Sequence, residues 1–161
     1  MFEIHIDDAE VKATLSALQH RLVNPGMLMR NIANMLESQA QEAFRQEGPG
    51  WKPLALATIR QRAKRGQADS PILNLSGGRG LLGSLMSGST ATTAMVGAGS
   101  GKSADYAAIH QFGGMAGRGR NVAIPARPYL PMRDVGGATE LTPKVHSELM
   151  KMLGEFVEVG L

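Results

Sequence analysis

Apolar residues recur at helical spacing near the start of the chain. They form one stripe, at a period of about 3.6 residues, that consists of Val11, Leu15, Leu18 and Leu22. Asp7 and Asp8 precede the stripe, where acidic side chains cap a first turn and complement the helix dipole. Residues 24–26, Asn-Pro-Gly, interrupt the pattern. The pattern therefore predicts a helix that ends before this break.

Two longer stripes predict the main helices of the fold. From Met27 to about Arg45, apolar and polar residues fall on opposite faces, and we expect the longest helix there. The apolar set is Leu28, Ile32, Met35, Leu36, Ala40, Ala43 and Phe44. A last helix is predicted to start at Thr142 as its cap, with Pro143 at the first helical position. Its apolar face consists of Val145, Leu149, Met152, Leu153 and Phe156.

Alternation of apolar and polar residues predicts short strands. Residues 2–6 alternate from the first position on, and small and β-branched residues from Thr90 to Val96 favour a second strand. Residues 122–124 are compatible with a further short strand. Three prolines between positions 125 and 131 then restrict the backbone to extended conformations. We interpret that stretch as a rigid connector.

The remaining helices are predicted to be short. A basic helix is expected from about Leu56 to Arg65, and another from Leu81 to Met86, entered at Ser76-Gly77. One or two helical turns are expected around residues 106–112. These elements lie between loops rich in glycine.

Loops are indicated by glycine and proline. The segment Gly48 to Pro53 carries the only tryptophan, Trp51, which we expect to anchor this loop on the core. The glycine-rich segments at about 97–104 and 113–121 lack an apolar period, and we interpret them as flexible and exposed. Such segments can order on assembly.

The order of these elements predicts a single α+β domain over residues 1–161, in which a long N-terminal helix and a C-terminal helix pack on a small, mostly antiparallel sheet. Hydrophobic residues make up 43% of the chain and charged residues 19%, which suffices for a core. With no cysteine, thiolate chemistry and disulfides are excluded, and a reducing cytoplasm is the simplest setting. No apolar run reaches about 18 residues and the start is acidic, so we expect neither a membrane span nor a secretory signal.

The small net charge of +3 conceals an asymmetry. Residues 1–51 carry four basic and seven acidic side chains, and residues 134–161 carry two and five, so each end has a net charge of −3. Residues 52–133 hold eleven basic and two acidic side chains, a net charge of +9. A basic middle can face nucleic acid or the acidic ends of a neighbouring copy, and charge does not choose between them.

Motifs for catalysis fail on spacing. Residues 96–103 are similar to a phosphate-binding loop, but Val96 stands where that loop requires its first glycine. Ser103, Asp105 and His110 are the residue types of a nucleophilic triad, yet they lie close in sequence and lack the nucleophile elbow. We interpret His110 as hydrogen-bonded locally. The four histidines show no metal-ligand pairing, and the sequence predicts no enzyme, metal or cofactor.

Basic residues gather on the predicted helix 56–65 and in the glycine-rich segment 113–121, as phosphate-binding surfaces do. No aromatic stacking partners lie nearby, which weakens the case for single-stranded nucleic acid. A solvated face, a contact between subunits and DNA binding all stay open. The candidate contacts with a neighbouring subunit or partner are Arg60, Arg62, Arg65, Arg118, Arg120 and Arg127.

Four stretches occur in a fixed order along the chain. They are Gly-Trp-Lys-Pro-Leu at 50–54, Ile-Leu-Asn-Leu-Ser-Gly at 72–77 running on to Ser84-Leu85, Tyr-Ala-Ala-Ile-His-Gln-Phe-Gly-Gly at 106–114, and Ile-Pro-Ala-Arg-Pro-Tyr-Leu-Pro at 124–131. Together they resemble the phage virion morphogenesis family, the tail-completion proteins of Mu-like and P2-like contractile-tailed phages. The resemblance spans roughly residues 44–131. Extra glycine between Gly77 and Leu81 departs from the family pattern, as does Tyr129 where phenylalanine is common.

This resemblance implies a structural protein of the virion that completes the tail at its head-proximal end and enables joining to the head. It implies a homo-oligomeric ring, with a hexamer as the expectation, that contacts the tail tube or sheath and neck or connector proteins. Such a protein is made in the host cytoplasm and ends in the virion, with a passing contact with genomic DNA left open. A head-completion or neck connector protein is the nearest alternative, and a basic DNA-binding protein is a more distant one.

Overall fold

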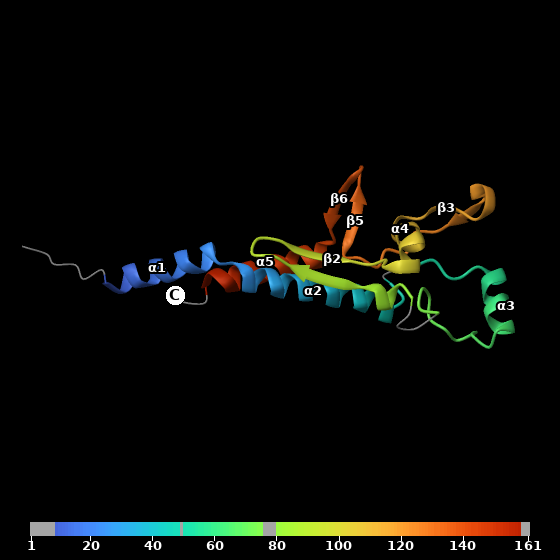
Figure 1. Cartoon of the computed structure of the whole chain (residues 1–161), viewed down its shortest axis with the longest axis horizontal. Helices are drawn as coiled ribbons and strands as arrows, with labels where there is room; N and C mark the ends of the chain where they lie inside the picture. Colours follow the sequence, from blue (N-terminus) through green and yellow to red (C-terminus); the bar gives the residue numbers. More distant parts are fainter. Residues whose placement is uncertain (1–8, 49, 76–79, 159–161) are drawn as a thin grey trace, which may run out of the picture.

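The computed structural model describes residues 9–48, 50–75 and 80–158. Helix α1, Ala9–Val23, and helix α2, Gly26–Arg45, follow one another along an elongated molecule (Figure 1). Asn24 and Pro25 separate them, as the sequence predicts. The expected strand at 2–6 and the cap at Asp7 and Asp8 lie outside the described residues.

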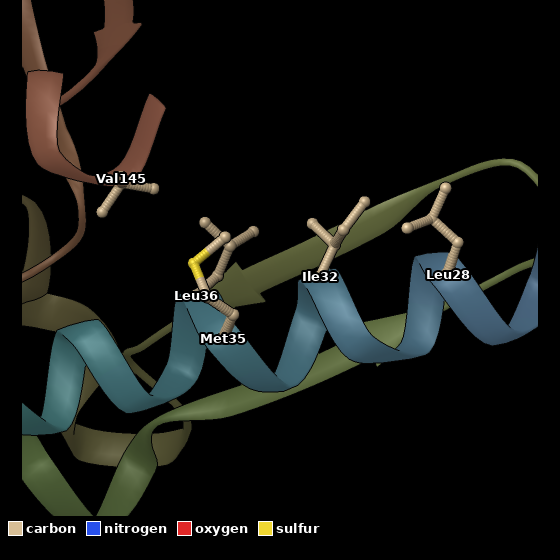
Figure 2. Close-up of a cluster of buried hydrophobic side chains, with 5 residues drawn as sticks. All are labelled: Leu28, Ile32, Met35, Leu36 and Val145. Atoms are coloured by element: carbon tan, nitrogen blue, oxygen red, sulfur yellow. The ribbon is translucent and has the colours of Figure 1, made fainter. Parts of the chain in front are cut away.

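A first core lies along the middle of α2. Strands β1, Met86–Ser89, and β2, Ala94–Gly97, form a hairpin against this helix, and helix α5, Pro143–Glu158, packs beside it (Figure 1). Figure 2 shows four α2 side chains on one face, with a valine entering from α5. These buried residues are Leu28, Ile32, Met35, Leu36 and Val145. Each buried aliphatic side chain contributes roughly 1.5–3 kcal/mol, so this face holds α2, α5 and the hairpin together.

A second core lies at the C-terminal end of α2. Phe44 meets Trp51 edge to face, with ring centroids 6.0 Å apart, and its ring lies 5.3 Å from that of Tyr129. Leu81 and Ala107 complete the buried cluster. Trp51 therefore anchors its loop as expected. Helix α2 contributes Phe44 to this second core and its preceding turns to the first core. One helix therefore links the two cores.

Short antiparallel hairpins supply the β-structure of the described residues, which confirms the α+β class. Besides β1–β2, strand β3, Gly114–Ala116, pairs with β4, Val122–Ile124. Strand β5, Met132–Val135, pairs with β6, Ala138–Leu141. The antiparallel pairing is thus divided among separate two-stranded hairpins.

Helix α3, Leu56–Lys64, and helix α4, Ala104–Phe112, match the basic helix and the short helix expected from the sequence. The helix predicted from Leu81 to Met86 is wrong. One 3-10 turn, Leu82–Ser84, stands there, and Met86 already begins β1. The Ser84 hydroxyl donates to Leu81 O and accepts from Gly99 N, so it ends the turn instead of extending a helix.

Two segments differ from the loops assigned to them. Residues 114–116, expected in a loop, form strand β3, while the turn from Gly117 to Arg120 is exposed as expected. In the segment 97–104, Gly97 ends β2 and a 3-10 turn, Gly101–Ser103, leads into α4. Hairpin β5–β6 was not predicted, although its Gly136-Gly137 turn is a hairpin signal.

Candidate assembly interface

Arg127 ties the proline-rich connector to the loop that follows α2. Its side chain is 6% exposed, and its Nε and Nη2 donate to Lys52 O at 3.1 and 2.9 Å. Nη2 also donates to Pro53 O at 3.2 Å. The guanidinium of this candidate contact is therefore engaged inside the subunit.

Trp51, Gln111 and Tyr129 extend the same network. Trp51 Nε1 donates to Pro128 O at 2.9 Å, and the Tyr129 hydroxyl donates to Ala107 O at 3.1 Å. Gln111 Oε1 accepts from the main-chain N–H of Tyr129 and of Leu130, at 3.0 and 2.9 Å. The extra hydroxyl of Tyr129 thus has a buried partner. Burial raises the pKa of Tyr129 to about 12.

Gly113 allows the connector to cross close to the end of α4. It has φ 75°, and a Cβ built there would lie 2.9 Å from Ala126 N. Arg127 N donates to His110 O at 2.7 Å beside this crossing. We call the contacts among residues 50–54, 106–114 and 124–131 the motif junction. It unites three of the four stretches through bonds within one chain.

Arg62 has an equally internal role. It is 9% exposed, and its Nη1 donates to Ser70 O at 2.6 Å and to Pro71 O at 3.2 Å. These bonds hold the segment after α3 against the helix. The sequence grouped Arg62 with its neighbours on the basic helix, and no local signal in the sequence separates it from them.

The other four candidate arginines are exposed. Arg60 and Arg65 lie on or next to α3, and Arg118 and Arg120 lie in the turn between β3 and β4. Both elements lie at the end of the molecule opposite α1 (Figure 1). Exposed cations without a carboxylate partner in the described structure are available to an anionic surface.

Helix α1 presents an apolar stripe that the described chain does not cover. It contains no buried residue, and Val11 and Leu15 are 60% and 59% exposed. Leu22 and Val23 are also exposed, and Arg21 Nη1 donates to Phe156 O at 3.4 Å near the base of the helix. Exposed apolar stripes of this kind mark sites of protein association.

Ser103, Asp105 and His110 are not hydrogen-bonded to one another through their side chains in the described structure. The Ser103 hydroxyl donates to Ser100 O at 2.7 Å, and Asp105 is exposed. His110 packs edge to face with Tyr106, but its buried Nδ1 has no partner in the described structure, so the expectation of a local hydrogen bond was wrong. Burial and then Arg127 lower the pKa of His110. No histidine or carboxylate cluster suited to a metal ion occurs in the described part of the chain.

Comparisons with known proteins match nearly the whole chain. The phage virion morphogenesis family matches residues 6–157. Mu-like prophage FluMu G protein 2 of Haemophilus influenzae is 35% identical over 161 residues, which cover 99% of this chain and 98% of that protein. No solved structure matches. Among the described helices, none is long and apolar enough to cross a membrane.

Proposed function

Because the chain belongs to the phage virion morphogenesis family, we propose that it is a non-enzymatic tail-completion protein of a contractile-tailed phage or prophage. It acts at the head-proximal end of the tail, where it contacts the tail tube or sheath and the neck proteins and makes the tail competent to join the head. Its working form is a closed ring of identical subunits, for which we expect a hexamer.

The observation that carries this proposal is the uncovered surface of the subunit. Among the described residues of α1, Val11 and Leu15 are 60% and 59% exposed. Apolar side chains on α1 and on the outer face of β1–β2, such as Leu15, Met86 and Met95, contribute to this surface. A subunit with so much exposed apolar area is suited to burial against neighbours.

Charge supports a head-to-tail arrangement. In such a ring each subunit presents different surfaces to its two neighbours. The exposed arginines of α3 and of the β3–β4 turn belong to the sector of +9, and the acidic ends each carry −3. The basic end of one copy then faces an acidic end of the next, an attraction that salt weakens.

The test is the absolute mass in solution, measured by light scattering after size exclusion at several protein and salt concentrations. We expect a discrete closed oligomer for the unaltered chain. The double variant Arg60→Glu, Arg65→Glu should shift the mass towards monomer, most strongly at low salt. Arg62 is left unchanged because its side chain holds the fold.

The matched control is Lys144→Glu, Lys151→Glu, which changes the net charge equally but lies in the acidic C-terminal sector. This control should retain the oligomer. A monomer at every concentration of the unaltered chain would contradict the ring, and equal masses for both double variants would contradict the charge pairing.

The +9 sector also favours DNA binding as a second candidate function. An electrophoretic shift of duplex DNA that disappears between low and moderate salt would support it. No shift at low salt would exclude it.

A further inference from the structure

A cavity of about 590 Å³ opens beside the motif junction, between α3, α4 and β4. Arg62 of α3 and Arg127 of the connector both line it, and Tyr106 and His110 of α4 contribute to the same wall. Both arginines are at least nine-tenths buried. The cavity therefore has two largely desolvated cations in its wall.

Within the described ranges, these two cations have no anionic partner. Their acceptors are main-chain carbonyls, Ser70 O and Pro71 O for Arg62, and Lys52 O and Pro53 O for Arg127. Among the residues described, no aspartate or glutamate lines the cavity. Burial, and then the charge of Arg62, lower the pKa of Arg127. Buried charges that lack a counter-ion are costly, and a carboxylate placed between them removes that cost.

His110 adds a third polar group to the same wall. Its Nδ1 is buried without a hydrogen-bond partner in the described structure. An arriving carboxylate near Arg127 would also stabilise the protonated imidazole.

Apart from Lys52 and Thr58, the rest of the cavity lining is apolar. Its aliphatic lining includes Ile124 of β4 and leucines from three segments: Leu54, Leu73, Leu75 and Leu81. A bare phosphate would leave these side chains uncovered. A peptide that carries a carboxylate between aliphatic side chains satisfies both parts of the wall.

We propose that this cavity binds an acidic peptide segment of a second copy of this chain, with its carboxylate on Arg62 and Arg127 and its aliphatic neighbours against the leucines. The second copy is the source because acidic residues concentrate in both end sectors of the same sequence. This inference relies on the proposed ring only for the source of the peptide.

The first test isolates the cavity from assembly. The full chain is titrated with N-acetyl-Leu-Glu-Leu-amide, and the imidazole of His110 and the Nε groups of Arg62 and Arg127 are followed by NMR. The matched probe replaces Glu by Gln. We expect saturable shifts and about tenfold tighter binding of the Glu peptide, together with a rise in the pKa of His110. Equal affinity of both peptides, or binding of inorganic phosphate in place of them, overturns the proposal.

The second test asks whether the bound peptide comes from a second copy of this chain. Thr58 lines the cavity one helical turn before Arg62, so Thr58→Glu supplies a carboxylate from within the subunit. This variant should fold, fail to bind the Glu peptide and lose mass in light scattering, whereas Thr58→Gln should behave as the unaltered chain. Full assembly of Thr58→Glu overturns the second copy as the source. A monomeric unaltered chain that binds the Glu peptide contradicts the ring and the second copy as the source, but not peptide binding by the cavity.

Discussion

Tyr129 connects the aromatic cluster at the end of α2 with the main chain of α4. Its ring packs against Phe44, and its hydroxyl donates to Ala107 O. Burial disfavours the phenolate and raises the pKa of Tyr129 to about 12, compared with about 10 in an unfolded chain. Because the folded pKa is the higher one, the contribution of Tyr129 to stability is complete below pH 10 and is lost as the pH rises to 12.

We expect Tyr129→Phe to lower the free energy of unfolding by about 1 kcal/mol at neutral pH and to flatten its decline above pH 10. The reason is that the variant leaves Ala107 O without its donor and has no phenol to ionise. Urea unfolding at several pH values measures both effects. Tyr106→Phe, which alters the only other tyrosine, is the control and should retain the decline.

The arginines show that the sequence alone does not predict which side chains are buried. Arg60, Arg62 and Arg65 stand together on one basic segment, yet Arg62 alone of the three is buried, because its helical position turns it towards Ser70 and Pro71. Arg127 is buried because the connector crosses α4 at Gly113. The burial of both arginines depends on contacts with other segments of the chain. Composition and charge do not predict such contacts.

At the scale of elements, α1 differs from α2 although both carry an apolar stripe. The stripe of α2 is covered by β1–β2 and α5, whereas α1 has no buried residue. An isolated helix of 15 residues is marginal in water. A partner surface would therefore stabilise α1 more than any other helix described.

The double variant Leu15→Ser, Leu22→Ser should change the free energy of unfolding of the dilute chain by at most about 0.5 kcal/mol, because both side chains are exposed. It should nevertheless reduce the mass of the oligomer. Leu36→Ala, inside the first core, should instead cost about 2–5 kcal/mol. Urea unfolding and light scattering separate the two cases, and strong destabilisation by the serine variant would show that α1 packs within its own subunit.

The long helices could be predicted because their stripes are regular over many turns, as in α2 and α5. The hairpins were harder to predict, because a strand of three or four residues contains too few alternations of apolar and polar residues to be recognised. Gly136-Gly137 was a turn signal, but the residues on either side of it showed no clear strand pattern. Strand β3 was not recognised because glycines flank it. At Leu81 to Met86 the pairing of Met86 with Gly97 prevailed over a local helical pattern.

At the scale of the whole molecule, two cores lie along α2 and α1 extends beyond them (Figure 1). Local stability follows buried apolar contacts. We expect amide hydrogen exchange at a concentration where the chain is monomeric to be fastest in α1 and slowest in α2. On assembly, protection of α1 should rise. Equal protection of both helices in the monomer would contradict this order.

The recognisable residues of the motif junction hold the chain of their own subunit together through the hydrogen bonds described above. Trp51, Gln111 and Arg127 fix the path of the chain, while the exposed arginines of α3 and of the β3–β4 turn take no part in that path. The path of the chain through the junction therefore does not depend on these exposed arginines. We expect that an α3 surface with other exposed charges can be grafted onto a foreign subunit with the same junction without disturbing its fold.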